Sequence, residues 1–220
     1  MWRSVAWTAM LLCLVLPASA PVGAVEQGGQ VAAPVDLLEG LRDGQLIAQF
    51  RGAGDAAVSG TIGGTGTEPL QVRIPSGTQF MAQLPGRQGM STLGSLNLNI
   101  GDGQLVQLSI ATACTALGLP EPTPEDVMIP LPCPEARLAR VAAVLDRYAV
   151  PQPVAQLAVW AISDNPPGQV LQPYLVEQAP GFDLAAYAQR REIVQQAAGL
   201  LQAAGLEVRA FRMFMGMRLG

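Results

Sequence analysis

The sequence predicts an α+β protein in which an immunoglobulin-like antiparallel β-sandwich is followed by a compact three-helix portion. In the range 45–114, short runs of alternating apolar and polar residues are separated by Gly, Pro, Asn and Asp, as in antiparallel sheets. Beyond residue 134, apolar residues recur at i, i+3, i+4 and i+7, which is the spacing of one helix face. A proline-dense segment, unsuited to a helix or a central strand, lies between the two parts.

Residues 1–24 are expected to be a signal peptide. Arg3 precedes an apolar run from Val5 to Leu16, which is shorter than the roughly 20 residues that a spanning helix needs. Small residues permit cleavage after Ala20 or Ala24, and we favour Ala24 because the other cut would leave a proline next to it. The alternative is an uncleaved anchor. Cleavage would make the mature chain secreted or extracytoplasmic (periplasm or cell surface), with no membrane span.

Residues 25–44 are predicted to be a leader containing a short helix, with Asp36 as its N-cap. The β-sandwich domain is predicted over residues 45–114. Its strands follow as Leu46–Phe50, Ala57–Ile62, Leu70–Ile74, Gln79–Met81, Leu93–Ile100 and Leu105–Ile110. Their inward-facing side chains should be mostly buried in one sandwich: Leu46, Phe50, Ile62, Val72, Ile74, Phe80, Leu96, Leu98, Val106 and Leu108.

Residues 115–133 are predicted to be a proline-rich connector, and residues 134–220 a helical portion. The first helix should begin with Pro134, and the second should run from about Pro153 to Asp164. The third should have Asp183 as its N-cap and Gly205 just after its end. The tail from Glu207 to Phe214 alternates between polar and apolar residues and predicts a final short strand.

The composition excludes several classes of function. All 13 basic residues are arginine, and the sequence contains neither lysine nor histidine. Histidine-dependent acid–base catalysis, Schiff-base lysines and phosphate-loop lysines are therefore excluded. The net charge of −4 argues against a nucleic-acid surface. We expect no enzyme, no metal site and no cofactor.

The cysteines supply the first candidate site. Cys13 lies in the expected signal peptide, so Cys114 and Cys133 remain in a compartment that permits disulfides. A bond between these two would close a loop of roughly 20 residues and contribute about 3 kcal/mol. It would tie the last predicted strand to the first helix, and it is the interpretation that we prefer. Two free or buried thiols are a further alternative.

A second candidate site pairs Cys114 with Gln156. Ala113-Cys114 ends a predicted strand, and Gln156-Leu157-Ala158-Val159-Trp160 lies in a predicted helix. This pattern resembles the Gln motif of bacterial thioester domains, found in secreted surface adhesins. The resemblance implies that Cys114 condenses with the side chain of Gln156. It also implies that Trp160, one turn further along the helix, shields the bond from water.

The sequence therefore predicts a secreted, non-enzymatic structural or binding module that acts through surface contacts with an extracellular or envelope partner it does not identify. The alternative function is a thioester-type covalent adhesin domain that uses Cys114 and Gln156.

Overall fold

The computed structural model describes residues 33–172 and 184–215. The expected signal peptide and the expected N-cap Asp183 lie outside the described residues. Their predictions therefore stay predictions.

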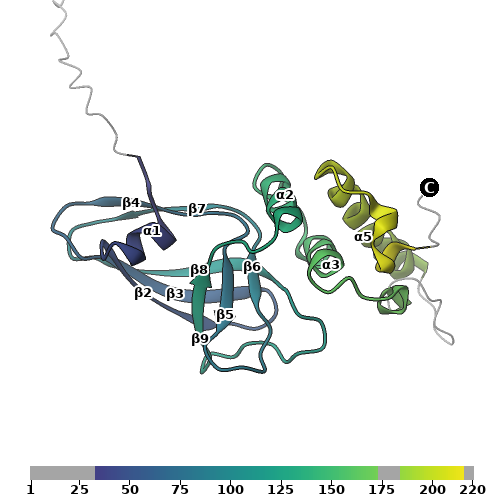
Figure 1. Ribbon diagram of the computed structural model, residues 1–220, viewed down its shortest axis with the longest axis horizontal. Helices are drawn as coiled ribbons and strands as arrows, with labels where there is room; N and C mark the ends of the chain where they lie inside the picture. The colour runs from purple at the N-terminus through teal and green to yellow at the C-terminus, as the bar shows by residue number, and fades with distance from the viewer. Residues whose placement is uncertain (1–32, 173–183, 216–220) are drawn as a thin grey trace, which may run out of the picture. The chain divides into compact units, whose positions relative to one another are not determined.

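The fold is α+β, but the prediction of an immunoglobulin-like sandwich is wrong. Six strands close into an antiparallel barrel in the order β2-β3-β8-β6-β5-β9 (Figure 1). Their bounds are Leu46–Gly52 (β2), Ala57–Gly64 (β3), Gln79–Ala82 (β5), Met90–Thr92 (β6), Leu105–Cys114 (β8) and Val127–Leu131 (β9). A separate mixed sheet contains β1 (Val35–Asp36), β4 (Leu70–Ile74) and β7 (Leu96–Ile100), with β1 parallel and β7 antiparallel to β4.

Strand β9 accounts for the difference between sandwich and barrel. It lies in the segment predicted as a connector, and it pairs with β2 on one side and with β5 on the other. Both architectures bury alternate side chains of each strand, so the alternation of the sequence does not distinguish them. The long-range pairing of β9 decides between the two.

The predicted core positions nevertheless face one hydrophobic core, which the barrel shares with the smaller sheet. Six of them are buried: Leu46, Phe50, Ile62, Val72, Ile74 and Phe80. The remaining four pack against this core while half-buried: Leu96, Leu98, Val106 and Leu108.

The segment predicted as a leader contributes to the same core. Asp36 is the N-cap of α1 (Leu37–Arg42), as predicted, and its carboxylate accepts hydrogen bonds from the backbone N–H groups of Leu38 and Glu39. Leu37 is fully buried in the barrel core. The short helix is thereby attached to the barrel by its apolar side.

Three longer helices build a second core. They are α2 (Ala136–Leu145), α3 (Gln152–Ser163) and α5 (Leu184–Ala203), and a single 3₁₀ turn, η1 (Gly168–Leu171), follows α3. Helix α2 begins two residues later than predicted. Pro134, which was expected as its first residue, lies before the N-cap Glu135. Gly205 follows α5 with a φ of 70°, the left-handed conformation expected after a helix end.

The predicted final strand is also wrong. Residues 207–214 form two 3₁₀ turns, η2 (Val208–Ala210) and η3 (Arg212–Phe214). Hydrogen bonds within the segment, such as Ala210 N–H to the Glu207 carbonyl, satisfy its backbone without a partner strand. Its apolar side chains Phe211, Met213 and Phe214 are buried in the helical core.

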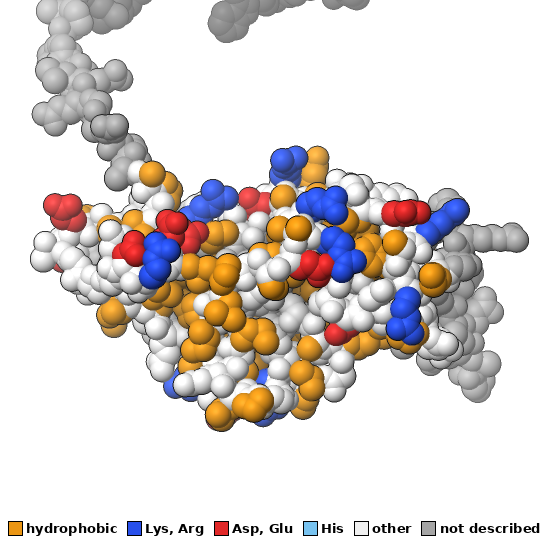
Figure 2. Space-filling model, viewed as in Figure 1, with side chains coloured by type: hydrophobic (Ala, Val, Ile, Leu, Met, Phe, Trp, Pro, Cys, Tyr) orange, Lys and Arg blue, Asp and Glu red, His pale blue; other side chains and the backbone are white. Residues whose placement is uncertain are grey.

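Apolar and charged side chains are distributed unevenly over the surface. Figure 2 shows hydrophobic side chains gathered over the barrel part of one face, and most of the charged side chains visible there lie along one side of the molecule. Several large apolar side chains on barrel strands are exposed: Ile47, Met81, Leu105, Ile129 and Leu131. In the described ranges, no helix combines the length and the apolarity needed to cross a membrane.

Candidate functional site

The two cores meet at the end of β8. Because successive side chains of a strand point to opposite faces, Ala113 lies in the helical core and Cys114 in the barrel core. Cys114 is 1% exposed. The strand end therefore connects the barrel to α3, and both partners of the predicted thioester pair lie at this junction.

Gln156 binds the backbone of Cys114 with both ends of its side-chain amide. Its Oε1 accepts a hydrogen bond from Cys114 N–H at 2.8 Å, and its Nε2 donates to the Cys114 carbonyl, also at 2.8 Å. Gln156 itself is 7% exposed. The amide thus takes the place of a neighbouring strand, since it supplies the donor and the acceptor that a paired residue would supply.

Cys114 needs this partner because β8 continues for three residues beyond its last pair with β3. The last β3–β8 pair is Ala57 with Ala111. The next N–H on the β3 side of β8, that of Thr112, donates a hydrogen bond to the Ala56 carbonyl. Beyond that point β3 has no residue paired with β8. Without Gln156 the backbone groups of Cys114 would be buried with no partner, which costs about 1–3 kcal/mol for each group.

Helix α3 presents a row of side chains, four residues apart, to this strand end. Gln152 donates from Nε2 to Gln156 Oε1 at 3.4 Å, so this oxygen receives two donors. Asp164, two turns beyond Gln156, accepts a hydrogen bond from the backbone N–H of Leu117. The same helix face therefore holds the chain at Cys114 and again just after it.

Trp160 lies between Gln156 and Asp164 in this row. It is half-buried and packs against the helical core. Within the described part of the chain its Nε1 is buried without a hydrogen-bond partner. Its predicted role as a shield of the Cys114–Gln156 bond stays a prediction.

The thiol of Cys114 points into the barrel. Its Sγ donates to the Asp55 carbonyl at 3.3 Å and contacts Met90 Sδ at 3.7 Å. Burial, with a smaller contribution from the carboxylates of Asp55 and Glu121, raises the pKa of this thiol to about 12. At neutral pH Cys114 is therefore a protonated thiol, unlike the low-pKa cysteines of thiol enzymes.

The predicted Cys114–Cys133 disulfide is wrong. Both cysteines are free, and Cys133 donates to the Glu135 carbonyl at 3.5 Å. Cys114 ends β8, whereas Cys133 follows β9, and two strands separate β8 from β9 in either direction around the barrel. At about 4.8 Å between neighbouring strands, this separation exceeds the roughly 7 Å between Cα atoms that a disulfide tolerates.

A groove of about 380 Å³ opens beside the Cys114–Gln156 pair. Strand β8 and the β2–β3 hairpin form one wall, and the loop between α2 and α3 forms the other. Its lining residues are Ala56, Leu93, Gly94, Ala111, Leu145, Tyr148, Ala149, Val150 and Gln152. None of these carries a carboxylate or a guanidinium group. Gln152 connects the groove to the site through its hydrogen bond to Gln156.

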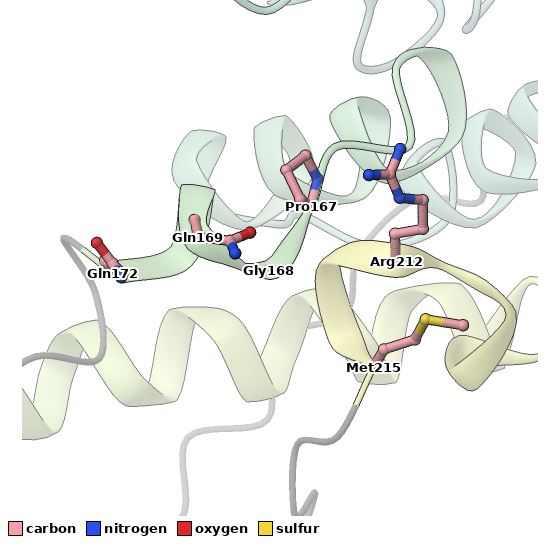
Figure 3. Close-up of a pocket in the computed structure, with 6 residues that line it drawn as sticks. All are labelled: Pro167, Gly168, Gln169, Gln172, Arg212 and Met215. Carbon is pink, nitrogen blue, oxygen red and sulfur yellow. The ribbon is translucent and has the colours of Figure 1, made fainter.

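Another cavity, of about 480 Å³, lies between η1 and η3 (Figure 3). Its lining includes one charged side chain, Arg212, together with Gln169, Gln172 and Met215. No thiol, carboxylate or hydroxyl group is among the lining side chains, so the cavity supplies no nucleophile. Among the described residues, no group of three or more Cys, Asp or Glu is placed to hold a metal ion.

The chain matches no protein-family model, no curated protein and no solved structure. The candidate site therefore depends on the geometry described above. Sequence reasoning identified Cys114, Gln156 and Trp160, but it missed Gln152 and the groove. The signal for Gln152 was its position one helical turn before Gln156.

The free cysteines give a first prediction. In the native protein at neutral pH, a maleimide should label Cys133, which is half-exposed, at least about tenfold faster than Cys114, because only an accessible thiol reacts. Peptide mass mapping after a timed labelling would measure both rates. If Cys133 were labelled only after reduction, it would be part of a disulfide, and this would contradict the structure.

Proposed function

We propose that this chain is a secreted, non-enzymatic binding module whose contact with its partner becomes covalent through a thioester between Cys114 and Gln156. The observation that carries the proposal is the double hydrogen bond between the Gln156 amide and the Cys114 backbone. It brings the only cysteine of β8 and the glutamine of the resembled motif together at one buried point.

The step that forms the thioester is an acyl transfer. Cys114 Sγ attacks Gln156 Cδ, the S–C bond forms, and the C–Nε2 bond breaks. The thiol proton goes to the departing nitrogen, which leaves as ammonia, so no oxidant or cofactor is needed. Rotation about χ1 of Cys114 from its position near Asp55 is the movement that this attack requires.

The hydrogen bonds around Gln156 support this step. As Sγ attacks, negative charge develops on Oε1, which already accepts bonds from Cys114 N–H and from Gln152. Donors fixed around a developing oxyanion lower the barrier to acyl transfer. The raised pKa of Cys114 means that the sulfur attacks as a thiol whose proton leaves with the nitrogen.

A thioester survives only where water is excluded and no internal nucleophile competes. Gln156 and Cys114 are both buried, and Trp160 lies one turn along the same helix face. The sequence contains no lysine, so no side-chain amine of this chain can consume the acyl group. An amine that attacks the Cys114–Gln156 thioester would therefore come from another molecule.

Methylamine incorporation tests the proposal. The native protein should take up one methylamine at Gln156, which adds about 31 Da to the thioester form and frees the Cys114 thiol. Cys114→Ala should abolish the uptake, and Cys133→Ala should leave it unchanged because Cys133 takes no part in the proposed bond. Mass spectrometry of the intact chain and of its peptides measures both. No uptake by the folded native protein would refute the proposed function.

A further inference from the structure

We infer that the groove beside Gln152 is the path by which a partner's amine reaches the acyl carbon of Gln156. This inference rests on the proposed function and adds to it the route and the shape of the nucleophile. The groove is lined by Gln152, whose Nε2 donates to Gln156 Oε1, so a single side chain separates the groove from the reacting group.

The chemistry of the groove selects its occupant. Its walls are mainly small or aliphatic side chains, among them Ala56, Leu93, Leu145 and Val150, and Gln152 adds one amide group. An unbranched aliphatic chain that ends in a primary amine fits such a lining, because its methylene groups contact apolar walls while its amine reaches the amide group. The side chain of a lysine has this form.

The occupant comes from a different protein. A second copy of this chain offers no lysine, since all 13 basic residues are arginine. Arginine is unsuited because its guanidinium stays protonated, whereas the amine of a lysine can lose its proton. The free amine attacks the acyl carbon, the C–S bond breaks, and the proton that the nitrogen releases goes to Cys114 Sγ, so an amide and a free thiol result. The partner therefore presents a lysine on a protruding segment that fits between β8 and the α2–α3 loop.

The outer wall of the groove can be altered without touching the reacting residues. Tyr148 is 63% exposed and Ala149 is also exposed, and both belong to the loop between α2 and α3. Ala149→Trp should narrow the groove, and Tyr148→Ala should widen it. Ala143→Trp is the matched control, because Ala143 is exposed on α2 and does not line the groove.

The experiment measures the rate of amine uptake for methylamine and for a lysine side chain with blocked backbone groups, in the native full-length variants. Ala149→Trp should slow uptake of the lysine compound by about tenfold or more and slow methylamine less, by steric exclusion. Tyr148→Ala should speed uptake of the lysine compound severalfold. Ala143→Trp should match the unaltered protein with both amines.

Each outcome separates the inference from the proposed function. Intact mass before amine addition shows whether the thioester has formed in each variant. If all variants carry the thioester and react at the same rate, the groove is not the path, while the proposed function stands. If the unaltered protein carries no thioester, the proposed function fails and the inference fails with it.

Discussion

Gln156→Glu should produce a protein whose stability depends steeply on pH. At neutral pH the new carboxylate would place an oxygen against the Cys114 carbonyl, which now accepts a hydrogen bond from Gln156 Nε2 at 2.8 Å. One carboxylate oxygen would keep the Cys114 N–H as its donor, but the other would face a carbonyl left unpaired. Compared with the chain that carries an intact Gln156 amide, this buried charge should lower the free energy of unfolding by about 2–5 kcal/mol. Near pH 4 the protonated carboxyl group donates to that carbonyl and accepts from Cys114 N–H, so most of the loss should be recovered.

The sign follows from the pKa of the new side chain. Burial and the facing carbonyl raise the pKa of the glutamate above that of the unfolded chain, so its favourable form is the neutral one. The stabilisation is present at low pH and is lost as the pH rises through the folded-state pKa.

Gln156→Leu is the matched control for this substitution, because it removes both hydrogen bonds at every pH and likewise removes the acyl group. Urea denaturation followed by tryptophan fluorescence should find Gln156→Glu the more stable of the two near pH 4, by about 2–4 kcal/mol, and find that this advantage disappears at pH 7. An advantage that is the same at both pH values would show that the amide does not pair with Cys114 as described.

Met128→Ala should lower the free energy of unfolding by about 2–5 kcal/mol, which is the usual cost of truncating a buried methionine. Met128 is 1% exposed and lies in β9, opposite Phe50 of β2 and Ala82 of β5. It therefore fills the barrel core at the strand that closes the barrel. If residues 127–131 were an exposed connector instead of a strand, Met128→Ala would change the free energy of unfolding little.

Ile129→Ala is the control for Met128→Ala. Ile129 is the next residue of β9, points to the outer face of the barrel and is 41% exposed. Its truncation should cost less than about 1 kcal/mol, because little apolar surface is re-exposed. Thermal or urea unfolding compares the two variants, and equal effects at both positions would contradict the barrel.

The sequence predicted those strands in which apolar and polar residues alternate within the strand itself. Leu70–Ile74 was predicted with the bounds that β4 has, and the apolar runs of β2, β3 and β8 were found with their ends shortened. Strand β9 was missed because the proline-dense run at residues 119–124 led to the prediction of a connector over the whole segment 115–133. Its existence depends on partners in β2 and β5, about 50 to 80 residues away, and no local pattern encodes that pairing.

The candidate site was predicted only in part, because contacts between distant segments are not encoded in a local pattern. Cys114 and Gln156 were singled out by residue type and by their resemblance to a known pattern, and the structure places them in contact. The choice of Cys133 as the partner of Cys114 was wrong because sequence distance was taken as spatial distance. The two residues are close along the chain, but they leave the barrel on strands that lie opposite each other.

The mass of the untreated protein tests the central claim most directly. Electrospray mass spectrometry of the freshly purified chain, unfolded in acid without reductant, should find it about 17 Da lighter than its calculated mass, because thioester formation expels ammonia. Cys114→Ala and Gln156→Ala should each have their full calculated mass. An unaltered protein at its full calculated mass, with two free thiols, would contradict the thioester, and a deficit of about 2 Da would instead indicate a disulfide.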